Sequence, residues 1–355
     1  MIDPPPHTND VSAVNHLLKE FFEDSIRRAA EFDSSYERLW HSLYDLITSG
    51  GKRFRPAMTL MAYRAFGGQN IGHVIPIAAA GELLHFSLLI HDDVIDRDYV
   101  RYGVPNIAGR YQQTYASHAP SPDNLTHYAH SAAILGGDLM LSGAYQLVAS
   151  SGLPDTDRAE ALRLLSDSVF QVAGGELLDT ELSFMPYRVG DALKVADYKT
   201  ASYSFVLPLL TGATLAGASA SQKETLRSYA YNLGIAFQLA DDLLGVFGDA
   251  EQTGKSTVGD IIEGKRTYMV EQAFAAFSSK ERETFMSAFG NASATTKEIE
   301  ISRSLLESSG ARTATEQKVS AYAEKARQAL DELRLPPEHH QNFSDMIAKA
   351  ADRSS

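Results

Sequence analysis

The chain of 355 residues lacks cysteine altogether, which excludes disulfide bonds, thiolate zinc sites and cysteine nucleophiles. It also lacks an uninterrupted apolar run of about 18 residues or more, the length that a membrane-spanning helix needs. Its first residues, Met1-Ile-Asp-Pro-Pro-Pro-His-Thr8, do not follow the basic and then apolar pattern of a signal peptide. We therefore expect a cytoplasmic protein that inserts stably into no membrane.

Positive charge is scarce as well. The chain has 32 Lys and Arg residues against 45 Asp and Glu residues, so its formal net charge is -13. Binding to a phosphate backbone needs clustered Lys and Arg, so this balance argues against a nucleic-acid partner. A small anionic ligand is not excluded, because a few basic residues or a metal ion can reverse the sign of the charge inside a cleft.

Strand patterns are few, whereas apolar residues recur with helical spacing from Val11 onward. With 44% hydrophobic and 22% charged residues, a chain of this length can bury a large core. The stretch 117–124 is rich in proline, serine and asparagine, and we interpret it as a surface insertion in one continuous bundle. We predict an all-α, single-domain fold over residues 11–355, after a disordered N-terminal tail at residues 1–10. The expected helices cover approximately 11–31, 36–48, 56–66, 74–98, 126–150, 157–184, 190–198, 205–217, 221–247, 266–277, 280–289, 296–308, 311–333 and 337–351.

Three acidic residues, Asp92, Asp93 and Asp96, end a long apolar stretch that begins at Ile75. Helical spacing puts Asp92 and Asp96 on one face, with Asp93 at its edge. Like charges four residues apart cost roughly 0.2 to 0.5 kcal/mol on an exposed helix, and more beside an apolar core. A hard divalent cation with oxygen ligands removes both penalties, so the pattern predicts a metal ion here.

A second acidic pair, Asp241 and Asp242, lies in another apolar stretch, 236–247. Magnesium is usually held by one or two carboxylates together with waters and substrate phosphates. Two acidic helices therefore predict a divided magnesium site with a phosphorylated ligand between them. Taken alone, either pair is equally compatible with a solvated helix surface.

Basic residues occur where a phosphorylated ligand would need them. Two glycines precede Lys52, and Arg55 stands before Pro56, which suits the first turn of a helix. Lysine supplies a point charge and arginine a planar fork that grips phosphate oxygens. A solvated basic loop is the alternative explanation. Further positive charges occur at Lys199, beside the hydroxyl of Thr200, and at Lys255 and Lys265.

Six motifs occur in the order Gly51-Lys-Arg-Phe-Arg-Pro56, His85, Asp92-Asp-Val-Ile-Asp96, Lys199-Thr200, Gln238-Leu-Ala-Asp-Asp242 and Gly264-Lys-Arg-Thr267. Together they resemble the trans-isoprenyl diphosphate synthase (polyprenyl synthetase) family, and within it the geranylgeranyl diphosphate synthases. The resemblance covers most of the chain. It implies an all-α prenyltransferase bundle around a central cavity, a homodimer, and three Mg²⁺ ions. The implied reaction is the head-to-tail condensation of isopentenyl diphosphate with an allylic diphosphate, started by metal-triggered ionisation.

The resemblance also assigns roles to individual positions. Magnesium would be held by Asp92, Asp93, Asp96, Asp241 and Asp242. The allylic diphosphate would face Arg101, Lys199, Lys255 and Lys265, and isopentenyl diphosphate would contact Lys52, Arg55 and His85. The expected catalytic residues are Lys199, Thr200 and Gln238.

The mildest departure from the family pattern is Glu176, where the family usually has glutamine after Gly175. Two further positions depart from it more strongly. Gly245 replaces the third acid of the second motif, although Asp249 lies nearby. Tyr102 stands where the family usually has a second arginine that grips isopentenyl diphosphate, so we expect weaker binding of that substrate. These changes motivate one alternative, a non-catalytic or regulatory subunit of a heteromeric prenyl synthase. A class I terpene cyclase is the other alternative, but it needs no second diphosphate site such as Lys52 and Arg55 would form.

The length of the product should depend on the helix that carries the first motif. In the family, an aromatic residue four or five positions before the first aspartate tends to stop growth at C15, and here these positions are Leu88 and Ser87. A helical rise of about 1.5 Å per residue puts Gly81 about 16 Å from Asp92, with Leu84 between them. We therefore expect a product longer than farnesyl diphosphate, namely geranylgeranyl diphosphate, with Leu84, Ser87 and Leu88 setting its length. The alternative is that these side chains only pack the core.

Overall fold

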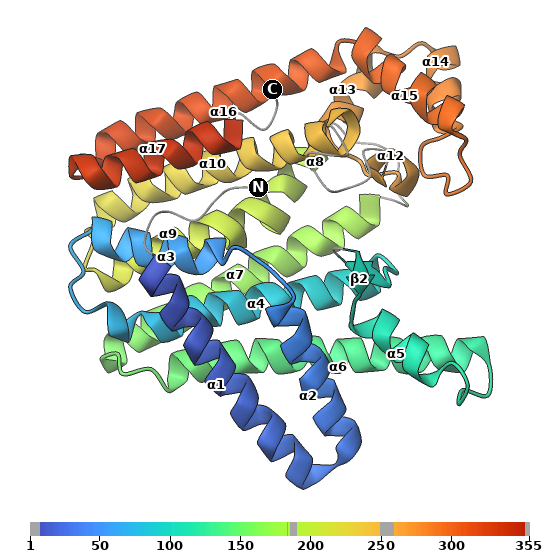
Figure 1. Cartoon of the computed structure of the whole chain (residues 1–355). Coiled ribbons are helices and arrows are strands. Elements are labelled where there is room, and N and C mark those ends of the chain that lie inside the picture. Colours follow the sequence, from blue (N-terminus) through green and yellow to red (C-terminus); the bar gives the residue numbers. More distant parts are fainter. Residues whose placement is uncertain (1–7, 102, 183, 185–189, 249–258, 352–355) are drawn as a thin grey trace. The chain divides into compact units, whose positions relative to one another are not determined.

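The computed structural model describes residues 8–101, 103–182, 184, 190–248 and 259–351 (Figure 1). Over these residues the regular structure is helical, apart from one two-stranded hairpin. The described chain groups into two compact units. The first comprises residues 8–166 and 208–218, and the second comprises residues 167–207 and 219–351.

The first unit begins with an antiparallel helix pair joined at Asp33, whose Oδ1 accepts a hydrogen bond from Ser35 N at 2.7 Å and so caps the second helix. Its elements are α1 (Thr8–Phe32), α2 (Ser34–Thr48), α3 (Phe54–Ala65), the 3₁₀ turn η1 (Ile71–His73), α4 (Ile75–Ile95), β1 (Val100–Arg101), β2 (Val104–Pro105), α5 (Ile107–Tyr115), α6 (Pro122–Ala149), the part of α7 (Asp155–Leu182) up to Ser166, and α9 (Leu207–Leu215) from Pro208.

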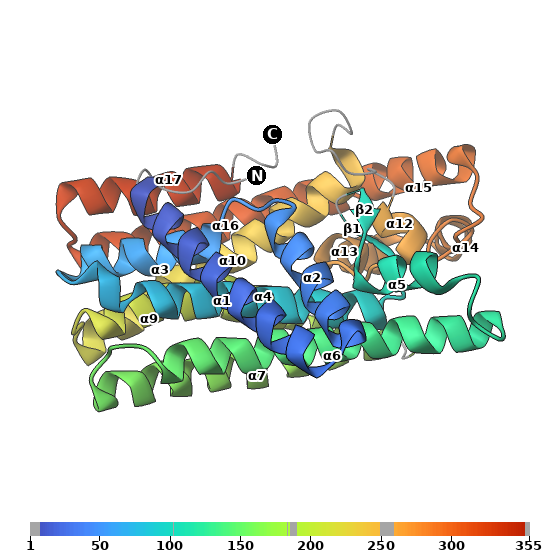
Figure 2. The ribbon, with the colours of Figure 1, turned by 60° about the horizontal axis from the view of Figure 1, so that its bottom comes forward.

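Helices α4 and α6 lie side by side in the first unit (Figures 1 and 2). Glycines on α6 allow the close approach. A Cβ added at Gly143 would lie 3.2 Å from Leu83 Cδ1 on α4, and one at Gly137 would lie 2.7 Å from His91 Cε1. Since Leu83 and Ile90 are fully buried, α4 is a core helix that carries the acidic residues at its C-terminal end.

A short hairpin turns the chain back after α4. Arg97 takes the left-handed conformation at φ 61°, and Gly103 supplies φ 78° in the turn between the strands. Val100 pairs with Pro105 and Arg101 with Val104 in an antiparallel register. This reversal brings Arg101 back towards the end of α4.

The second unit is built around α10, which packs against α16, α17 and a π-helical segment. Its core includes Leu239 and Leu243 of α10, together with Phe285, Leu306 and Val319 from later helices. The elements are α7 from Asp167, α8 (Asp191–Val195), the π-helix η2 (Ala196–Val206), α10 (Ala220–Phe247), α12 (Gly259–Glu263), α13 (Tyr268–Ala276), α14 (Ser279–Met286), α15 (Thr296–Ser308), α16 (Ala311–Leu333) and α17 (Pro337–Ala351).

The segment η2 has π-helical geometry over its whole length, and at its end Leu207 N–H donates to the Ser202 carbonyl, five residues back. The sequence pattern predicts separate helices at 190–198 and 205–217, so this continuity is a correction. Single wide turns of this kind are frequent at functional sites. The predicted catalytic residues Lys199 and Thr200 lie in this segment.

Helices α15, α16 and α17 have the predicted bounds. The prediction for 117–124 is wrong in its second half, because α6 already begins at Pro122. There Ser121 Oγ accepts from Asn124 N at 3.2 Å, and proline occupies the first turn.

Helix α1 starts three residues before Val11, while residues 1–7 lie outside the described part of the chain. The sequence pattern predicts none of α5, α12 and the hairpin, which are all short.

Two described helical stretches, Ile71–Ile95 and Pro122–Ala149, are long and apolar enough to cross a membrane by length and composition alone. In the most apolar 18 residues of each stretch, 61% and 50% of the window, respectively, is buried inside the protein. The mostly buried core helix of a soluble protein meets the same criteria of length and composition.

Candidate active site

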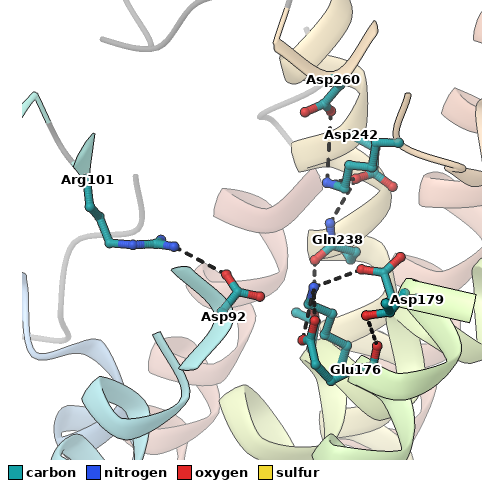
Figure 3. A network of polar contacts seen from close by, with 11 residues as sticks. Asp92, Arg101, Glu176, Asp179, Gln238, Asp242 and Asp260 are labelled. Atoms are coloured by element: carbon teal, nitrogen blue, oxygen red, sulfur yellow. Dashed lines mark hydrogen bonds and ion pairs between the residues drawn. The ribbon is translucent and has the colours of Figure 1, made fainter. Parts of the chain in front are cut away.

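Arg101 holds both of the first two acidic residues at the end of α4. Its Nε donates to Asp93 Oδ1 at 2.7 Å and its Nη2 donates to Asp92 Oδ2 at 3.2 Å. Figure 3 shows Arg101 reaching from its strand towards Asp92. Burial raises the pKa of Asp93, although the hydrogen bond and charge of Arg101 oppose this rise. Asp96 follows one turn later, exposed, with its N–H bonded to Asp92 O at 2.8 Å.

One face of α4 is partly exposed along its length. The half-buried residues Gly81, His85, Leu88 and Asp92 follow one another at helical spacing. The predicted chain-length residues divide between two faces: Leu88 lies on this stripe, whereas Leu84 and Ser87 are each only 1% exposed. Leu88 therefore shares the face that carries Asp92.

The charges of three guanidinium groups of the first unit act on His85. Burial, followed by the charges of Arg55, Arg101 and Arg53, lowers the pKa of His85 well below its ordinary value. The imidazole is consequently neutral near pH 7 and can both donate and accept a hydrogen bond. Lys52 is exposed in the loop before α3. Arg55 is half-buried in the first turn of α3.

Arg53, between these two basic residues, was not predicted as a site residue. It takes the left-handed conformation at φ 49° and is 8% exposed. Its Nη1 donates to Glu82 Oε1 at 2.9 Å, its Nε to Asn15 Oδ1 at 2.8 Å and its Nη2 to the Ile47 carbonyl at 2.6 Å. Arg53 thus fixes the loop that presents Lys52. The sequence signal for it was an acid, Glu82, in the middle of an apolar helix.

In the second unit, a chain of polar contacts leads from the π-helix to the second acidic pair (Figure 3). Thr200 Oγ1 donates to Gln238 Oε1 at 2.7 Å, and Gln238 Nε2 donates to Asp242 Oδ1 at 2.8 Å. Lys265 Nζ donates to the same Asp242 oxygen at 3.0 Å. Hydrogen bonds therefore link four residues that the sequence predicts as parts of the site, namely Thr200, Gln238, Asp242 and Lys265.

Lys199 points from the π-helix to two acids of α7. Its Nζ lies 2.8 Å from Asp179 Oδ2 and 3.0 Å from Glu176 Oε2. The backbones approach closely here, since a Cβ at Gly175 would lie 2.7 Å from the Tyr198 carbonyl carbon. The lysine is thereby positioned by acids that sequence reasoning did not include among the site residues.

The charges around Asp242 and Lys265 are strongly coupled. Burial raises the pKa of Asp242, against the effect of Lys265, and Asp260 raises it further. Burial alone would lower the pKa of Lys265, but Asp242, Asp260 and Asp241 together raise it well above its ordinary value. Lys265 is therefore a firmly protonated cation among three acids.

The donor sets fit magnesium that is shared with a ligand. Among the described residues, no group of three or more His, Cys, Asp and Glu side chains is assembled as a metal site. Each unit instead offers a carboxylate pair whose negative charge is partly balanced by one basic side chain. Magnesium commonly completes such a shell with waters and substrate phosphates. Of the predicted residues, Lys255 lies outside the described part of the chain, as do Tyr102 and Asp249.

Comparison with known proteins gives the same family. The model for the polyprenyl synthetase family matches residues 37–306. The geranylgeranyl diphosphate synthase of Sulfolobus acidocaldarius is 30% identical over 292 residues, which is 81% of this chain and 80% of that protein. The geranylfarnesyl diphosphate synthase of Aeropyrum pernix is 32% identical over 304 residues, which is 84% of this chain and 88% of that protein.

A solved structure agrees with these relatives. Geranylgeranyl pyrophosphate synthase from Corynebacterium glutamicum, in complex with isoprenyl diphosphate and magnesium, superposes with a TM-score of 0.90 at 30% identity and covers 96% of this chain and 98% of its own. This agreement confirms the predicted all-α prenyltransferase fold as a single domain. The chain therefore belongs to the polyprenyl synthetase family and is a trans-isoprenyl diphosphate synthase, an enzyme that condenses isopentenyl diphosphate head to tail with an allylic diphosphate.

Proposed function

We propose that this enzyme makes geranylgeranyl diphosphate, with Mg²⁺ as its cofactor. The observation that carries the proposal is that both acidic pairs of such a synthase are present, each bonded to a basic side chain: Arg101 at Asp92 and Asp93, and Lys265 at Asp242. Relatives named for C20 and C25 products, and a relative solved with magnesium, support it.

In this proposal, Asp92, Asp93 and Asp96 hold magnesium, as do Asp241 and Asp242, with three ions in all. Bound magnesium would supply Lewis acidity to the diphosphate of the allylic substrate. Arg101, Lys199 and Lys265 would donate hydrogen bonds to its oxygens, with Lys255 as a further candidate.

The roles of these residues follow from their charge. As the allylic carbon–oxygen bond breaks, the diphosphate keeps the electron pair, and Arg101, Lys199 and Lys265 stabilise its growing negative charge. Lys52, Arg55 and the neutral His85 hold isopentenyl diphosphate, whose double bond attacks the allylic cation. An oxygen of the released diphosphate then takes a proton from the new cation, and the electrons of the broken carbon–hydrogen bond form the double bond of the next allylic diphosphate. Thr200 and Gln238, already hydrogen-bonded to each other, would lie near the reacting carbons.

The proposed C20 product rests on the half-buried stripe of α4. Leu88 and Ser87 occupy the positions at which an aromatic ring would stop growth at C15. Leu88 is aliphatic and faces the same side as Asp92. A chain can therefore extend past Leu88 towards Gly81, which lies about 16 Å from Asp92 by helical rise.

We also propose a cytoplasmic homodimer. Leu135 on α6 is 57% exposed, with Ile134 beside it at 46%, and Phe170 on α7 is 83% exposed. Exposed apolar side chains that adjoin one another in a contiguous patch commonly mark protein contacts. Sedimentation of the wild type and of Leu135→Glu tests this: a dimer that dissociates in the variant supports it, and a monomeric wild type contradicts it.

The decisive test is a magnesium-dependent assay of the purified chain, with isopentenyl diphosphate and dimethylallyl, geranyl or farnesyl diphosphate offered separately. A C20 product that requires magnesium supports the proposal. A C15 or C25 product would keep the reaction and overturn the length. No elongation with any starter, by folded protein, would favour the non-catalytic subunit that Tyr102 and Gly245 suggest, or the terpene cyclase.

A further inference from the structure

Glu176, which stands where the family usually has glutamine, lies beside Lys199. Both oxygens of its carboxylate approach Lys199 Nζ, Oε1 at 3.2 Å and Oε2 at 3.0 Å. Asp179, one turn later on α7, places its Oδ2 at 2.8 Å from the same Nζ. Figure 3 shows the two acids below Gln238. Two carboxylates therefore face one ammonium, and one of them is a departure from the family pattern.

These contacts match the full hydrogen-bonding capacity of the lysine side chain. An ammonium has three N–H donors, and three carboxylate oxygens lie within 3.2 Å of Lys199 Nζ. A diphosphate oxygen that binds this ammonium must therefore displace a carboxylate oxygen. The longer contacts belong to Glu176, whose side chain also has one more rotatable bond than that of Asp179. Glu176 is consequently the group that yields to a ligand.

The place of Lys199 in the fold does not depend on the charge of Glu176. At Gly175 the backbones of α7 and η2 are in contact, since a Cβ there would lie 2.5 Å from Lys199 N. Glutamine at position 176 would conserve the shape of the side chain, and its amide oxygen could still accept a hydrogen bond. What glutamate adds at this position is therefore a negative charge on the lysine.

We propose that Glu176 sets the affinity of this enzyme for allylic diphosphates by competing with them for Lys199. The inference deepens the proposed function and rests on it, because it assumes that Lys199 binds the allylic diphosphate. An intermediate that is to be elongated again needs its own diphosphate at the same lysine. Glu176 consequently also determines how long intermediates are retained before they are released.

The variant Glu176→Gln removes the competing charge and keeps the hydrogen bond. The KM for farnesyl diphosphate should fall about fivefold, as should the Kd for inorganic diphosphate with Mg²⁺ in a calorimeter, because a neutral acceptor holds the lysine less strongly. The value of kcat should change by less than about twofold, since uniform binding does not alter it. With dimethylallyl diphosphate as the starter, the variant should release a smaller share of C10 and C15 intermediates.

Three controls separate the charge from other effects. Lys199→Met should raise the KM for farnesyl diphosphate about tenfold or more. Glu176→Gln/Lys199→Met should stay within about twofold of Lys199→Met, because the competition no longer has an object. Glu181→Gln removes the same charge from an exposed position of α7 and should behave as the wild type does. An unchanged Tm of Glu176→Gln would confirm that the fold is intact.

The outcomes distinguish this inference from the proposed function. A wild type that does not elongate, or an unchanged KM in Lys199→Met, would refute the proposed function or the role of Lys199 in it. If both behave as expected, an unchanged or higher KM in Glu176→Gln would refute only the role of Glu176. The same fivefold gain in the absence of Lys199 would show that Glu176 repels the diphosphate directly, which would also overturn the competition.

A lower Tm of Glu176→Gln together with a lower kcat would show that Glu176 has a structural role, and this too would contradict the proposal.

Discussion

Lys265 Nζ and Gln238 Nε2 both donate to a single oxygen, Oδ1 of Asp242, at 3.0 and 2.8 Å. The buried carboxylate is thus neutralised before any substrate arrives. An ammonium on a flexible stem can move from a carboxylate to a phosphate oxygen when a metal ion takes its place. Lys265 is therefore suited to respond to the allylic diphosphate.

Replacing Lys265 by Met should lower kcat/KM for the allylic diphosphate by roughly 10- to 100-fold, the loss expected for a hydrogen bond to a charged group. Steady-state kinetics with each substrate varied in turn would measure it. The KM for isopentenyl diphosphate should change little, and Lys265→Arg should recover part of the loss. Lys349→Met, at an exposed lysine of α17, is the matched control. A rise only in the KM for isopentenyl diphosphate would contradict this role.

The buried pair of Arg53 and Glu82 should be important for both stability and substrate binding. Glu82→Gln leaves the guanidinium in the core without its counter-charge, which typically destabilises a protein by about 3 to 5 kcal/mol. Urea unfolding would measure the loss. The double variant Arg53→Met/Glu82→Met should lose less than the sum of the single variants. Glu324→Gln, which breaks the exposed contact with Arg327, should have little effect. Additive losses would show that Arg53 and Glu82 are not coupled.

Asp197, two residues before Lys199 in η2, gives a pH-dependent prediction. Burial raises the pKa of Asp197 from 3.8 to about 6. Between these two pH values the folded state binds more protons than the unfolded state, so this group makes the protein less stable as pH rises. Asp197→Asn should therefore be more stable than the wild type at pH 7, by on the order of 1 to 2 kcal/mol because solvent screens this half-buried group, and about equal to it at pH 4.

Denaturant unfolding at both pH values checks this prediction, with Glu332→Gln as an exposed control on α16. An equal gain for Asp197→Asn at pH 4 and pH 7 would mean that the carboxyl group is not desolvated as the structure indicates.

The half-buried position of Leu88 predicts a change of product. Leu88→Phe places a ring on the face that carries Asp92, and should shift the product distribution from C20 towards C15. Chromatography of the dephosphorylated products would measure the shift. Leu88→Ile conserves volume and should leave the distribution unchanged. Leu84→Ala opens a position that is only 1% exposed, so it should lower Tm, and it should lengthen the product only if this buried wall limits growth.

Much of the molecule could be predicted from its sequence, because long helices have strong apolar periodicity and clear ends. The acidic pairs were recognisable since carboxylates stand out at the ends of apolar helices. What could not be predicted depends on contacts between distant residues. Asp260 fills the space beside Gly245, Glu82 pairs with Arg53, and Asp179 positions Lys199, and none of these pairs has a local sequence pattern.

The hairpin that carries Arg101 was missed because its strands have only two residues each. A pattern of alternation needs more positions than that. The π-helix was missed for a related reason, since its periodicity differs from that of an α-helix over too few turns to be visible.

The π-helix of Ala196–Val206 has a consequence for the evolution of this chain. Its bonds reach five residues back where an α-helix reaches four, so deletion of a single residue could let regular α-helix run on from α8. Every later side chain of the segment would then turn by about 100° relative to those before the deletion. Such a variant would be locally more regular and a poorer synthase. We therefore expect the regular conformation and the one that places Lys199 and Thr200 in their present contacts to be different.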